Sequence, residues 1–436
     1  MSDPQYVPLS TVLLPPISGK RPAGGVSSET DGVPSIGGEN ILSNGGMTYE
    51  ELKRIPYSFF KFMPKGRLLR DDVLINKDGA QTGKVGFYGG DFEEAAVNEH
   101  VFILRSRDQN LLDQRYLYYC VLLPETRNKI ERRITGSAQP GLNSQFVKAV
   151  DIPFQGLTQQ KKIATILSGI DTAIEKTEAL IAKYQQIKAG LMHDLFTRGV
   201  LPSGQLRPIE SSSSTQFGKI PFGWKLGSIL ELTDPQRQPI LTGPFGADLG
   251  NADFVAEGIP VLRIGNVQQG ELDLSDLLYV TPRKAALLGR YRIKSGDLLF
   301  ARQGATTGRN ALATKLVDGF LINYHIIRVA LDHERCAPLF VEAAFANEVV
   351  KRQIERDKGR GTREGINTAQ ITSLAFPIAP LNEQRQIAQI LKKINLQIEA
   401  TQAELNSYRM RKCGLMHDLL TGKVPVKVEE PEVVDG

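Results

Sequence analysis

Two short glycine-rich loops have the residues that come nearest to a phosphate-binding motif. The first is GAQTGK at residues 79–84, and the second is GATTGR at residues 304–309. A nucleotide phosphate loop needs four residues between its glycines and a Ser or Thr after its lysine. Here three residues separate the glycines and Val85 follows Lys84, so a nucleotide site is excluded. Two interpretations remain: a tight turn between strands, or a loop whose basic end contacts a phosphate or a guanine.

Basic side chains favour the second interpretation, because they gather in both halves of the chain. The clusters lie within residues 61–70, 127–133, 283–292 and 351–363. A charge run is usually only a solvated face, but its recurrence is typical of a surface that contacts a polyanion. The candidate contacts to nucleic-acid phosphates or base edges are Gln81, Thr82, Lys84, Arg132, Arg133, Arg302, Thr307, Arg309, Arg360 and Arg363.

Catalytic and metal-binding patterns are not found in the sequence. His193 and His417 recur within HDL without ligands at a zinc spacing, so we expect helix packing and predict no metal site. His100 and His325 follow β-like segments, where core or hydrogen-bonded roles are expected. No nucleophile elbow, HExxH motif, dinucleotide fingerprint or nuclease-like carboxylate cluster occurs, and LPPI at residues 14–17 does not fit the Pro-Pro motif of amino-methyltransferases. The sequence therefore predicts a binding and organising protein.

Two long helices are expected to position these residues. Residues 157–200 return as residues 381–424 at a constant offset of 224, with about half of the positions identical. Apolar residues alternate in steps of four and three, the heptad seam of a helix packed on another helix. The predicted packing and partner-docking residues are Ile163, Leu167, Ile170, Ile174, Thr177, Tyr184, Leu191, Ile387, Leu391, Ile394, Ile398, Thr401, Tyr408 and Leu415.

The length and the interruptions of the seam carry further expectations. Forty helical residues span roughly 60 Å, so we expect the two copies to pack on each other as a spacer. The alternative is two unrelated helices, each docked on its own domain. Thr177 matches Thr401 and Lys188 matches Lys412; these polar positions either mark the register or are tolerated in a loosely packed layer.

The segments before the helices repeat more weakly and predict two like domains of mixed α/β fold, a tandem repeat with a pseudo-two-fold arrangement. Matching pairs are Asn40 and Asn266, Asp72 and Asp297, Asn98 and Asn323, His100 and His325, and Tyr6 with a restart at Ile220. A helical stretch is expected from about Gln114 to Arg133. Loops 43–67 and 268–292 differ, which suggests two related but non-identical ligands. The predicted order is domain 1–150, helix 151–200, flexible linker 201–219, domain 220–375, helix 376–424 and acidic tail 425–436.

Composition sets the remaining bounds. No apolar run reaches membrane-spanning length, and three scattered cysteines form neither a disulfide framework nor a CxxC site, so a reducing cytoplasm is expected. A net charge of +5 permits a polyanionic partner without demonstrating one.

With these motifs assembled, the chain resembles the specificity subunit of type I restriction–modification systems. The signatures are L-x-E-Q-x-x-I-A-x-I-L at Leu381 to Leu391, the GLMxDLLTG-like helix end at Gly414 to Gly422, and a G-D-x-L…G-x-x-G turn in each domain. The resemblance covers essentially the whole chain. Gln159 replaces the Glu in the first helix, and Asp71 stands where the family usually has Gly.

The resemblance implies a non-catalytic DNA-recognition subunit. Each domain would be a target recognition domain that reads one half of a bipartite DNA sequence. The antiparallel helices would set the spacer and dock two methyltransferase subunits, which use S-adenosylmethionine. Motor-nuclease restriction subunits, which use ATP with magnesium, would join. The alternatives are an autonomous DNA-processing enzyme that uses the Lys84 and Arg309 loops, and a coiled-coil scaffold that does not bind DNA.

Overall fold

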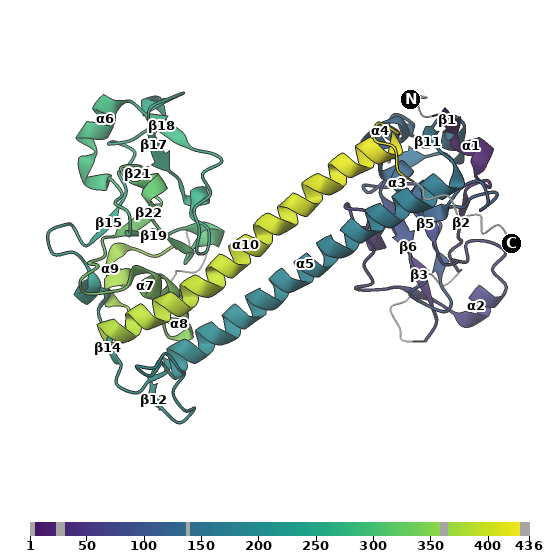
Figure 1. Ribbon diagram of the computed structural model, residues 1–436. Coiled ribbons are helices and arrows are strands. Elements are labelled where there is room, and N and C mark those ends of the chain that lie inside the picture. Colours follow the sequence, from purple (N-terminus) through teal and green to yellow (C-terminus); the bar gives the residue numbers. More distant parts are fainter. Residues whose placement is uncertain (1–4, 23–30, 137–139, 358–364, 428–436) are drawn as a thin grey trace. The chain divides into compact units, whose positions relative to one another are not determined.

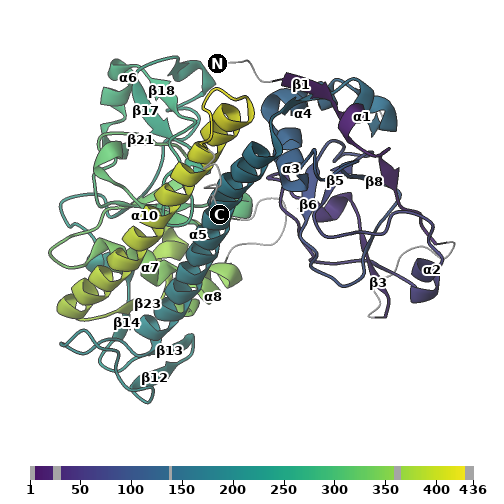
Figure 2. The same cartoon turned by 45° about the vertical axis from the view of Figure 1, so that its right-hand side comes forward.

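A computed structural model describes residues 5–22, 31–136, 140–357 and 365–427, in two compact units (Figures 1 and 2). The first unit combines residues up to Glu178 with those from Ala403 onward, and the second spans Ala179–Gln402. Both long helices, α5 (Leu157–Thr197) and α10 (Leu381–Leu420), therefore contribute one half to each unit. No described helix is long and apolar enough to cross a membrane.

The globular part of the first unit is a small mixed α/β domain. Its strands are β1 (Gln5–Pro8), β2 (Ile17–Ser18), β3 (Val33–Ile36), β4 (Arg54–Ile55), β5 (Asp72–Asn76), β6 (Val85–Tyr88), β7 (Ala96–Val97), β8 (Val101–Leu104), β9 (Ile134–Thr135), β10 (Gly141–Leu142) and β11 (Asp151–Phe154). Its helices are α1 (Leu9–Val12), α2 (Tyr57–Lys61), α3 (Gln114–Leu122) and α4 (Pro124–Glu131), with 3₁₀ turns η1 (Gly38–Asn40) and η2 (Ser144–Lys148).

The second unit is built from corresponding elements. Its strands are β12 (Ser212–Thr215), β13 (Gly218–Pro221), β14 (Lys225–Gly227), β15 (Ile240–Thr242), β16 (Phe254–Val255), β17 (Ile259–Leu262), β18 (Leu278–Val280), β19 (Leu298–Ala301), β20 (Asn310–Leu312), β21 (Leu321–Ile322), β22 (Ile326–Val329) and β23 (Phe376–Ile378). Its helices are α6 (Pro282–Leu287), α7 (Pro338–Phe345), α8 (Glu348–Asp357) and α9 (Thr368–Ser373), and its 3₁₀ turns are η3 (Ile229–Leu232), η4 (Asn251–Asp253), η5 (Ile264–Asn266), η6 (Gly289–Tyr291), η7 (Gly304–Thr306) and η8 (Lys315–Val317).

Sheet order confirms the weak repeat between the two domains. The four-stranded sheet β2-β8-β5-β6 of the first unit has its counterpart in β15-β22-β19-β20 of the second. Val73 faces Leu104 in one sheet, and Leu298 faces Val329 at the same place in the other. Likewise β3 pairs in parallel with β7, as β17 does with β21.

A buried carboxylate opens the central strand of each sheet and is neutralised in both. Asp72 receives two hydrogen bonds of 2.6 Å from the Arg105 guanidinium. Asp297 receives 2.6 and 2.8 Å bonds from Arg237, which precedes β15 instead of following β22. Because an unpaired buried charge is costly, the aspartate and some arginine are required together, while the strand that supplies the arginine has changed.

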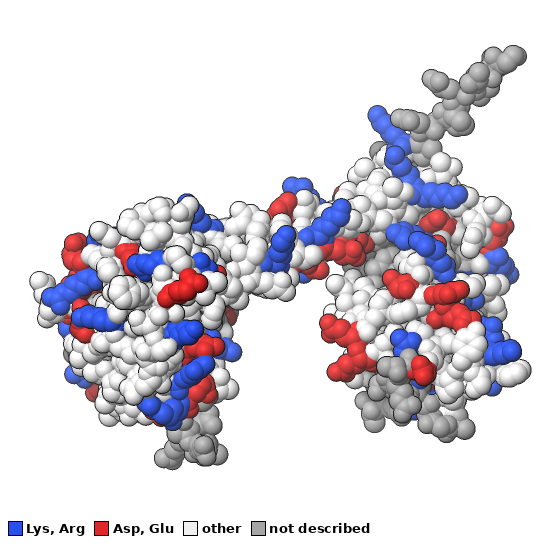
Figure 3. Space-filling model, turned by 90° about the horizontal axis from the view of Figure 1, so that it is seen from below, with Lys and Arg blue, Asp and Glu red and all other residues white. Residues whose placement is uncertain are grey.

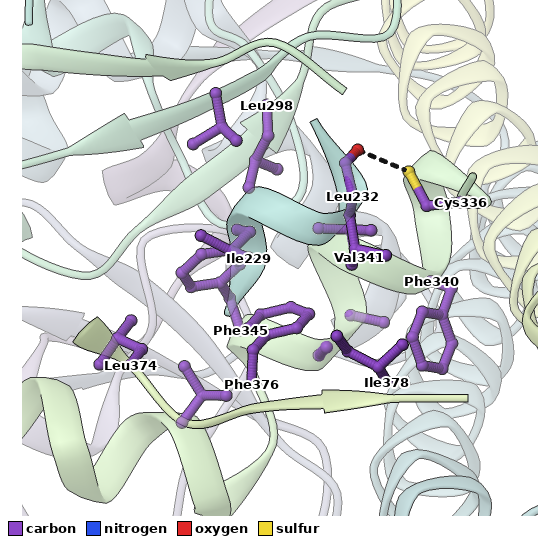
Figure 4. Packing of buried hydrophobic residues seen from close by; sticks show 14 of the residues in the cluster. Ile229, Leu232, Leu298, Cys336, Phe340, Val341, Phe345, Leu374, Phe376 and Ile378 are labelled. Atoms are coloured by element: carbon purple, nitrogen blue, oxygen red, sulfur yellow. Dashed lines mark hydrogen bonds between the residues drawn. The ribbon is translucent and has the colours of Figure 1, made fainter. Parts of the chain in front are cut away.

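The core of the second unit is rich in aromatic side chains. Phe340, Phe345 and Phe376 pack around aliphatic residues of η3, β19 and β23, and the Cys336 Sγ lies 3.5 Å from the Leu232 carbonyl oxygen (Figure 4). Leu391 of α10 and Leu195 of α5 belong to the same cluster. The helix halves are thus part of the domain core.

The two long helices run antiparallel, which is visible inside each unit. In the first, the Lys412 Nζ lies 2.6 Å from an Asp171 oxygen and Arg409 donates to Glu178 over 2.7 Å. In the second, the Glu383 carboxylate accepts the Val200 N–H and a bidentate pair from Arg207. The helices therefore pack on each other, as the heptad seam predicts.

A buried glutamine in the first turn of each long helix joins it to its domain. The Gln160 Oε1 accepts the Asp113 N–H, and its amide donates to the Leu111 and Gln155 carbonyls. Gln384 repeats this, accepting the Ala337 N–H and donating to the Ala379 carbonyl. Both glutamines are at most 1 % exposed.

Two local predictions are wrong, and a third is confirmed with a break. The helical stretch expected from about Gln114 to Arg133 is present as α3 and α4, which are separated at Leu123 because Pro124 disfavours a helical residue before it. The expected flexible linker 201–219 contains β12, which pairs with β13. Tyr6 corresponds to Leu226 instead of Ile220, since β1 pairs with β11 as β14 pairs with β23. Most of the expected acidic tail, from residue 428 on, lies outside the described residues.

Glu342 of α7 provides a test of the packing in the second unit. Burial raises the pKa of its carboxyl from 4.5 to about 7, although Lys188 opposes the shift. The folded state therefore holds a proton that the unfolded state releases, so the free energy of unfolding should fall by about 1–3 kcal/mol as the pH rises from 4.5 to 7. Glu342→Gln should remove this fall, measured by urea unfolding followed through Trp224, the only tryptophan of the chain.

Glu348→Gln, at an exposed side chain of the neighbouring helix, is the control and should leave the fall unchanged. Equal stability changes for Glu342→Gln at pH 5 and pH 8 would contradict the assignment.

Candidate nucleic-acid interface

The two glycine-rich loops are turns of the same geometry at the same edge of the two sheets. Residues 79–84 join β5 to β6, and residues 304–309 join β19 to β20. Gly79 and Gly83 have φ of 80° and 88°, and Gly304 and Gly308 have φ of 70° and 100°, where only glycine is unstrained. The turn interpretation is therefore correct, and it leaves the contact interpretation of the basic end open.

Side-chain bonds hold each turn closed. Thr82 Oγ1 donates to the Gly79 carbonyl over 2.6 Å, and Thr307 Oγ1 donates to the Gly304 carbonyl over 2.8 Å. Both hydroxyls are thus used within the turn. The predicted contact residues Thr82 and Thr307 have a structural task that explains their recurrence.

Among the described residues, no carboxylate pairs with the basic side chains at the ends of the turns. Lys84 Nζ donates to the Gln81 amide oxygen over 3.0 Å, and Arg309 Nη1 donates to the Gln268 amide oxygen over 2.6 Å. A neutral amide orients a cation without neutralising it. Each turn therefore presents one oriented positive charge, the arrangement that a phosphate contact requires.

A histidine next to each turn has a partner that the sequence did not reveal. His100 Nδ1 lies 2.6 Å from Asp78 Oδ1, and His325 Nδ1 lies 2.5 Å from Gln303 Oε1. The backbone N–H of each histidine also donates to the side-chain oxygen of the asparagine two residues earlier, Asn98 or Asn323. The expected hydrogen-bonded role is confirmed. The repeated Asn-x-His is a further signal in the sequence that marks this site, beside the glycine-rich loops.

The two histidine sites differ in charge. In the first unit, Glu99 adds a second carboxylate 3.2 Å from His100 Nε2. In the second, burial lowers the pKa of His325 and the nearby Arg302 charge lowers it further, and the Arg302 guanidinium lies 4.7 Å from the centre of the Tyr324 ring. The same backbone thus presents two carboxylates in one domain, of which Glu99 also pairs with Arg21 over 3.0 Å, and a cation with an aromatic face in the other.

The remaining predicted contacts are only partly placed. Arg132 and Arg133 are exposed where α4 ends. The chain that follows α4 reaches the first turn, where the Thr82 hydroxyl also donates to the Pro140 carbonyl. In the second unit, Gly365 bridges to Gln303 beside the turn. Arg360 and Arg363 lie outside the described residues.

Charge on the visible face of each domain is mixed. Figure 3 shows Lys and Arg interspersed with Asp and Glu on both domains, so neither presents a uniform basic field on this face. Among the described residues, no group of His, Cys, Asp and Glu is placed to hold a metal ion. The candidate site is therefore a set of separate oriented groups around each turn.

The predicted seam residues are all at least partly buried, and six of them belong to or pack against the domain cores: Ile163, Leu167, Leu415, Ile387, Leu391 and Leu191. Those that are buried are Ile163, Leu167, Thr177, Ile387, Leu391 and Thr401. Those that are half-buried are Ile170, Ile174, Tyr184, Leu191, Ile394, Ile398, Tyr408 and Leu415. Thr177 and Thr401 each donate to the carbonyl four residues earlier over 2.7 Å, so their hydroxyls are satisfied within their own helix.

Comparison with known proteins decides the family. A family model described as "Type I restriction modification DNA specificity domain" matches residues 13–186 and 250–407, one copy for each domain with its helix. The chain belongs to this family. As a specificity subunit it determines DNA target recognition in a type I restriction–modification system, and it is not a catalytic subunit.

Similar proteins extend over nearly the whole chain. The type I restriction enzyme MjaVIII specificity subunit of Methanocaldococcus jannaschii is 24 % identical over 94 % of this chain and 91 % of its own length. The EcoKI specificity subunit of Escherichia coli K12 is 23 % identical over 93 % and 86 %. The crystal structure of an S subunit from M. genitalium shares the fold, with a TM-score of 0.60, 14 % identity and coverage of 97 % and 96 %.

The oriented cations give a direct test of this interface. Lys84→Gln and Arg309→Gln should each weaken DNA binding several-fold and reduce the slope of log K against log salt concentration by about one. Fluorescence anisotropy of the assembled complex on its target duplex, at several salt concentrations, measures both effects.

Lys225→Gln is the matched control, because the Lys225 ammonium already pairs with the Glu231 carboxylate. An unchanged salt slope for both turn variants would remove these side chains from the set of phosphate contacts.

Proposed function

We propose that each globular domain reads one half of a bipartite DNA target, and that the antiparallel helices set the number of base pairs between the halves. One observation carries this proposal: the two units repeat the sheet order, the glycine turn and the buried glutamine, while the side chains around the turn differ. Like scaffolds with unlike side chains fit two different half-sites.

The differing groups suggest the chemistry of the readout. Asp78 and Glu99 are acceptors, suited to the cytosine N4 amino group, whereas Gln303 can bind adenine bidentately and Arg302 can bind guanine. Lys84 and Arg309 would contact the phosphate backbone next to these groups. Arg132, Arg133, Arg360 and Arg363 remain candidates for further backbone contacts.

The partners are those of a type I complex. The half-buried seam positions of α5 and α10 would dock two methyltransferase subunits, which bring S-adenosylmethionine and methylate adenine. Restriction subunits would join for cleavage that depends on ATP and magnesium. A related structure describes "complex assembly and conformational transition of the type I R-M system" and covers 97 % of this chain with a TM-score of 0.55. We expect the complex to act in the cytoplasm.

Mapping of methylated adenines tests the function. The chain is coexpressed with the modification subunit of its system, and the host DNA is sequenced by a single-molecule method. We expect one bipartite motif with two fixed halves and a constant gap. A soluble, assembled complex that adds no methylation would contradict the proposal.

The positions at which each long helix passes from one unit to the other allow a test of the spacer. The units divide after Glu178 in α5 and after Gln402 in α10, which are equivalent positions of the repeat. Four residues inserted at both positions lengthen each helix by about 6 Å, or roughly two base pairs of DNA. The mapped motif should keep both halves and gain about two base pairs of spacer; an altered half-site with the original gap would refute the role of the helices.

A further inference from the structure

The two most exposed large hydrophobic side chains among the described residues occupy equivalent positions. They are Phe62, which is 81 % exposed, and Leu287, which is 79 % exposed. The two residues are 225 positions apart, and each lies at the end of a short helix, α2 or α6. Five residues later, Arg67 forms a β-bridge to β7 and Arg292 forms one to β21. Single exposed hydrophobic residues are ordinary. Two extremes at one position of a duplicated fold indicate a shared task.

Each protruding side chain stands on a fixed base. The residue that follows it, Met63 or Leu288, is only 4 % exposed. Met63 packs with Val33, Ile55 and Phe60, and Leu288 packs in the larger cluster around β17 and α6. The exposed side chain is therefore presented by an anchored backbone, which lowers the entropic cost of using it in a contact.

The surrounding charge selects the partner. Residues 53–70 contain six Lys or Arg and residues 278–296 contain five, and neither segment has an Asp or Glu. Among the described residues, no hydrogen bond or ion pair engages the side chains of Lys61, Lys65 or Arg283. Lys284 and Lys53 are paired with Asp253 and Glu39, but each exposed apolar side chain still has at least one cation without a carboxylate partner close to it in the sequence. This combination fits DNA, because the cations can contact phosphates while the apolar group meets the bases.

We propose that Phe62 and Leu287 are wedges that enter a base step of the DNA, one in each half-site. The proposal rests on the DNA-recognition function proposed above and adds a contact apart from the glycine turns. Phe and Leu are among the side chains that separate neighbouring base pairs, and the deformation they impose makes flexible steps preferable to stiff ones. Part of the specificity would then come from deformability, without hydrogen bonds to bases.

Fluorescence of 2-aminopurine tests the wedges, because this base brightens when it is unstacked. It is placed at successive positions of the mapped target, away from the methylated adenine, and bound by the complex with its methyltransferase subunits. Phe62→Ala should abolish the increase in one half-site only and weaken binding roughly 5- to 100-fold, with an unchanged salt slope. Leu287→Ala should act in the other half-site, and Phe62→Leu should retain most of the signal.

Leu316→Ala is the matched control, since Leu316 is 76 % exposed but lies outside the basic segments. Normal fluorescence and affinity in both alanine variants would overturn the wedges and leave DNA recognition intact. Loss of complex assembly in these variants would show that the side chains contact a protein subunit, and would also overturn the proposal. No DNA binding by the wild-type complex would overturn the proposed function itself.

Discussion

The buried glutamine at the start of each long helix is the contact on which the rest of each unit depends. Gln160 uses both its acceptor and its amide donors to bind backbone groups of the domain and of the helix entry, and Gln384 repeats this in the second unit. Glutamate would lose the donors, and an aliphatic residue would leave buried backbone groups unpaired at about 1–3 kcal/mol each. The direction of the helix relative to its own domain is set here. Every group at the glycine turn therefore has a fixed place relative to that helix.

Because the scaffold of each unit is fixed in this way, the side chains around the glycine turn can vary. The buried Asp72 and Asp297 show how little of the sequence must be kept: the carboxylate stays, and its arginine comes from a segment next to a different strand in each unit. At the turn, the glycines, the alanine, the threonine and one basic residue recur, whereas Asp78 is replaced by Gln303. A few recurring residues maintain the backbone conformation in both units. The side chains that meet a ligand can therefore differ between the units. This separation is what two unlike half-sites demand.

The sequence predicts most strongly what depends on local periodicity. The two helices and their seam follow from apolar spacing, and the domain repeat follows from matched residues such as Asn40 and Asn266. The break before Pro124 can also be predicted from the sequence, because proline disfavours a helical conformation in the residue before it. The pairing of His100 with Asp78 was not, since it joins residues 22 positions apart through a sheet whose order no local pattern states. Exposure of Phe62 and Leu287 likewise needed the fold, because apolar residues after short helices are usually buried.

The polar interruptions of the seam show how a repeated helix pair obtains a defined register. In the first unit Lys412 pairs across the helices with Asp171, and both side chains are about one-fifth exposed. In the second unit Asn395 stands at the position of Asp171, and Lys188 instead faces the raised-pKa carboxyl of Glu342 from α7. The second unit has its own ion pair in the first turn of α10, where Glu383 binds Arg207 and the Val200 N–H. The first unit has Gln159 at the equivalent position. Each unit thus has one largely buried ion pair that ties the chain at one helix to the other helix, but at a different layer.

Two nearly identical seams can slide by whole heptads with little change in apolar contact, and a slipped register would leave these charges buried without partners. The charges, more than the leucines and isoleucines, therefore select the register that an unchanging spacer requires.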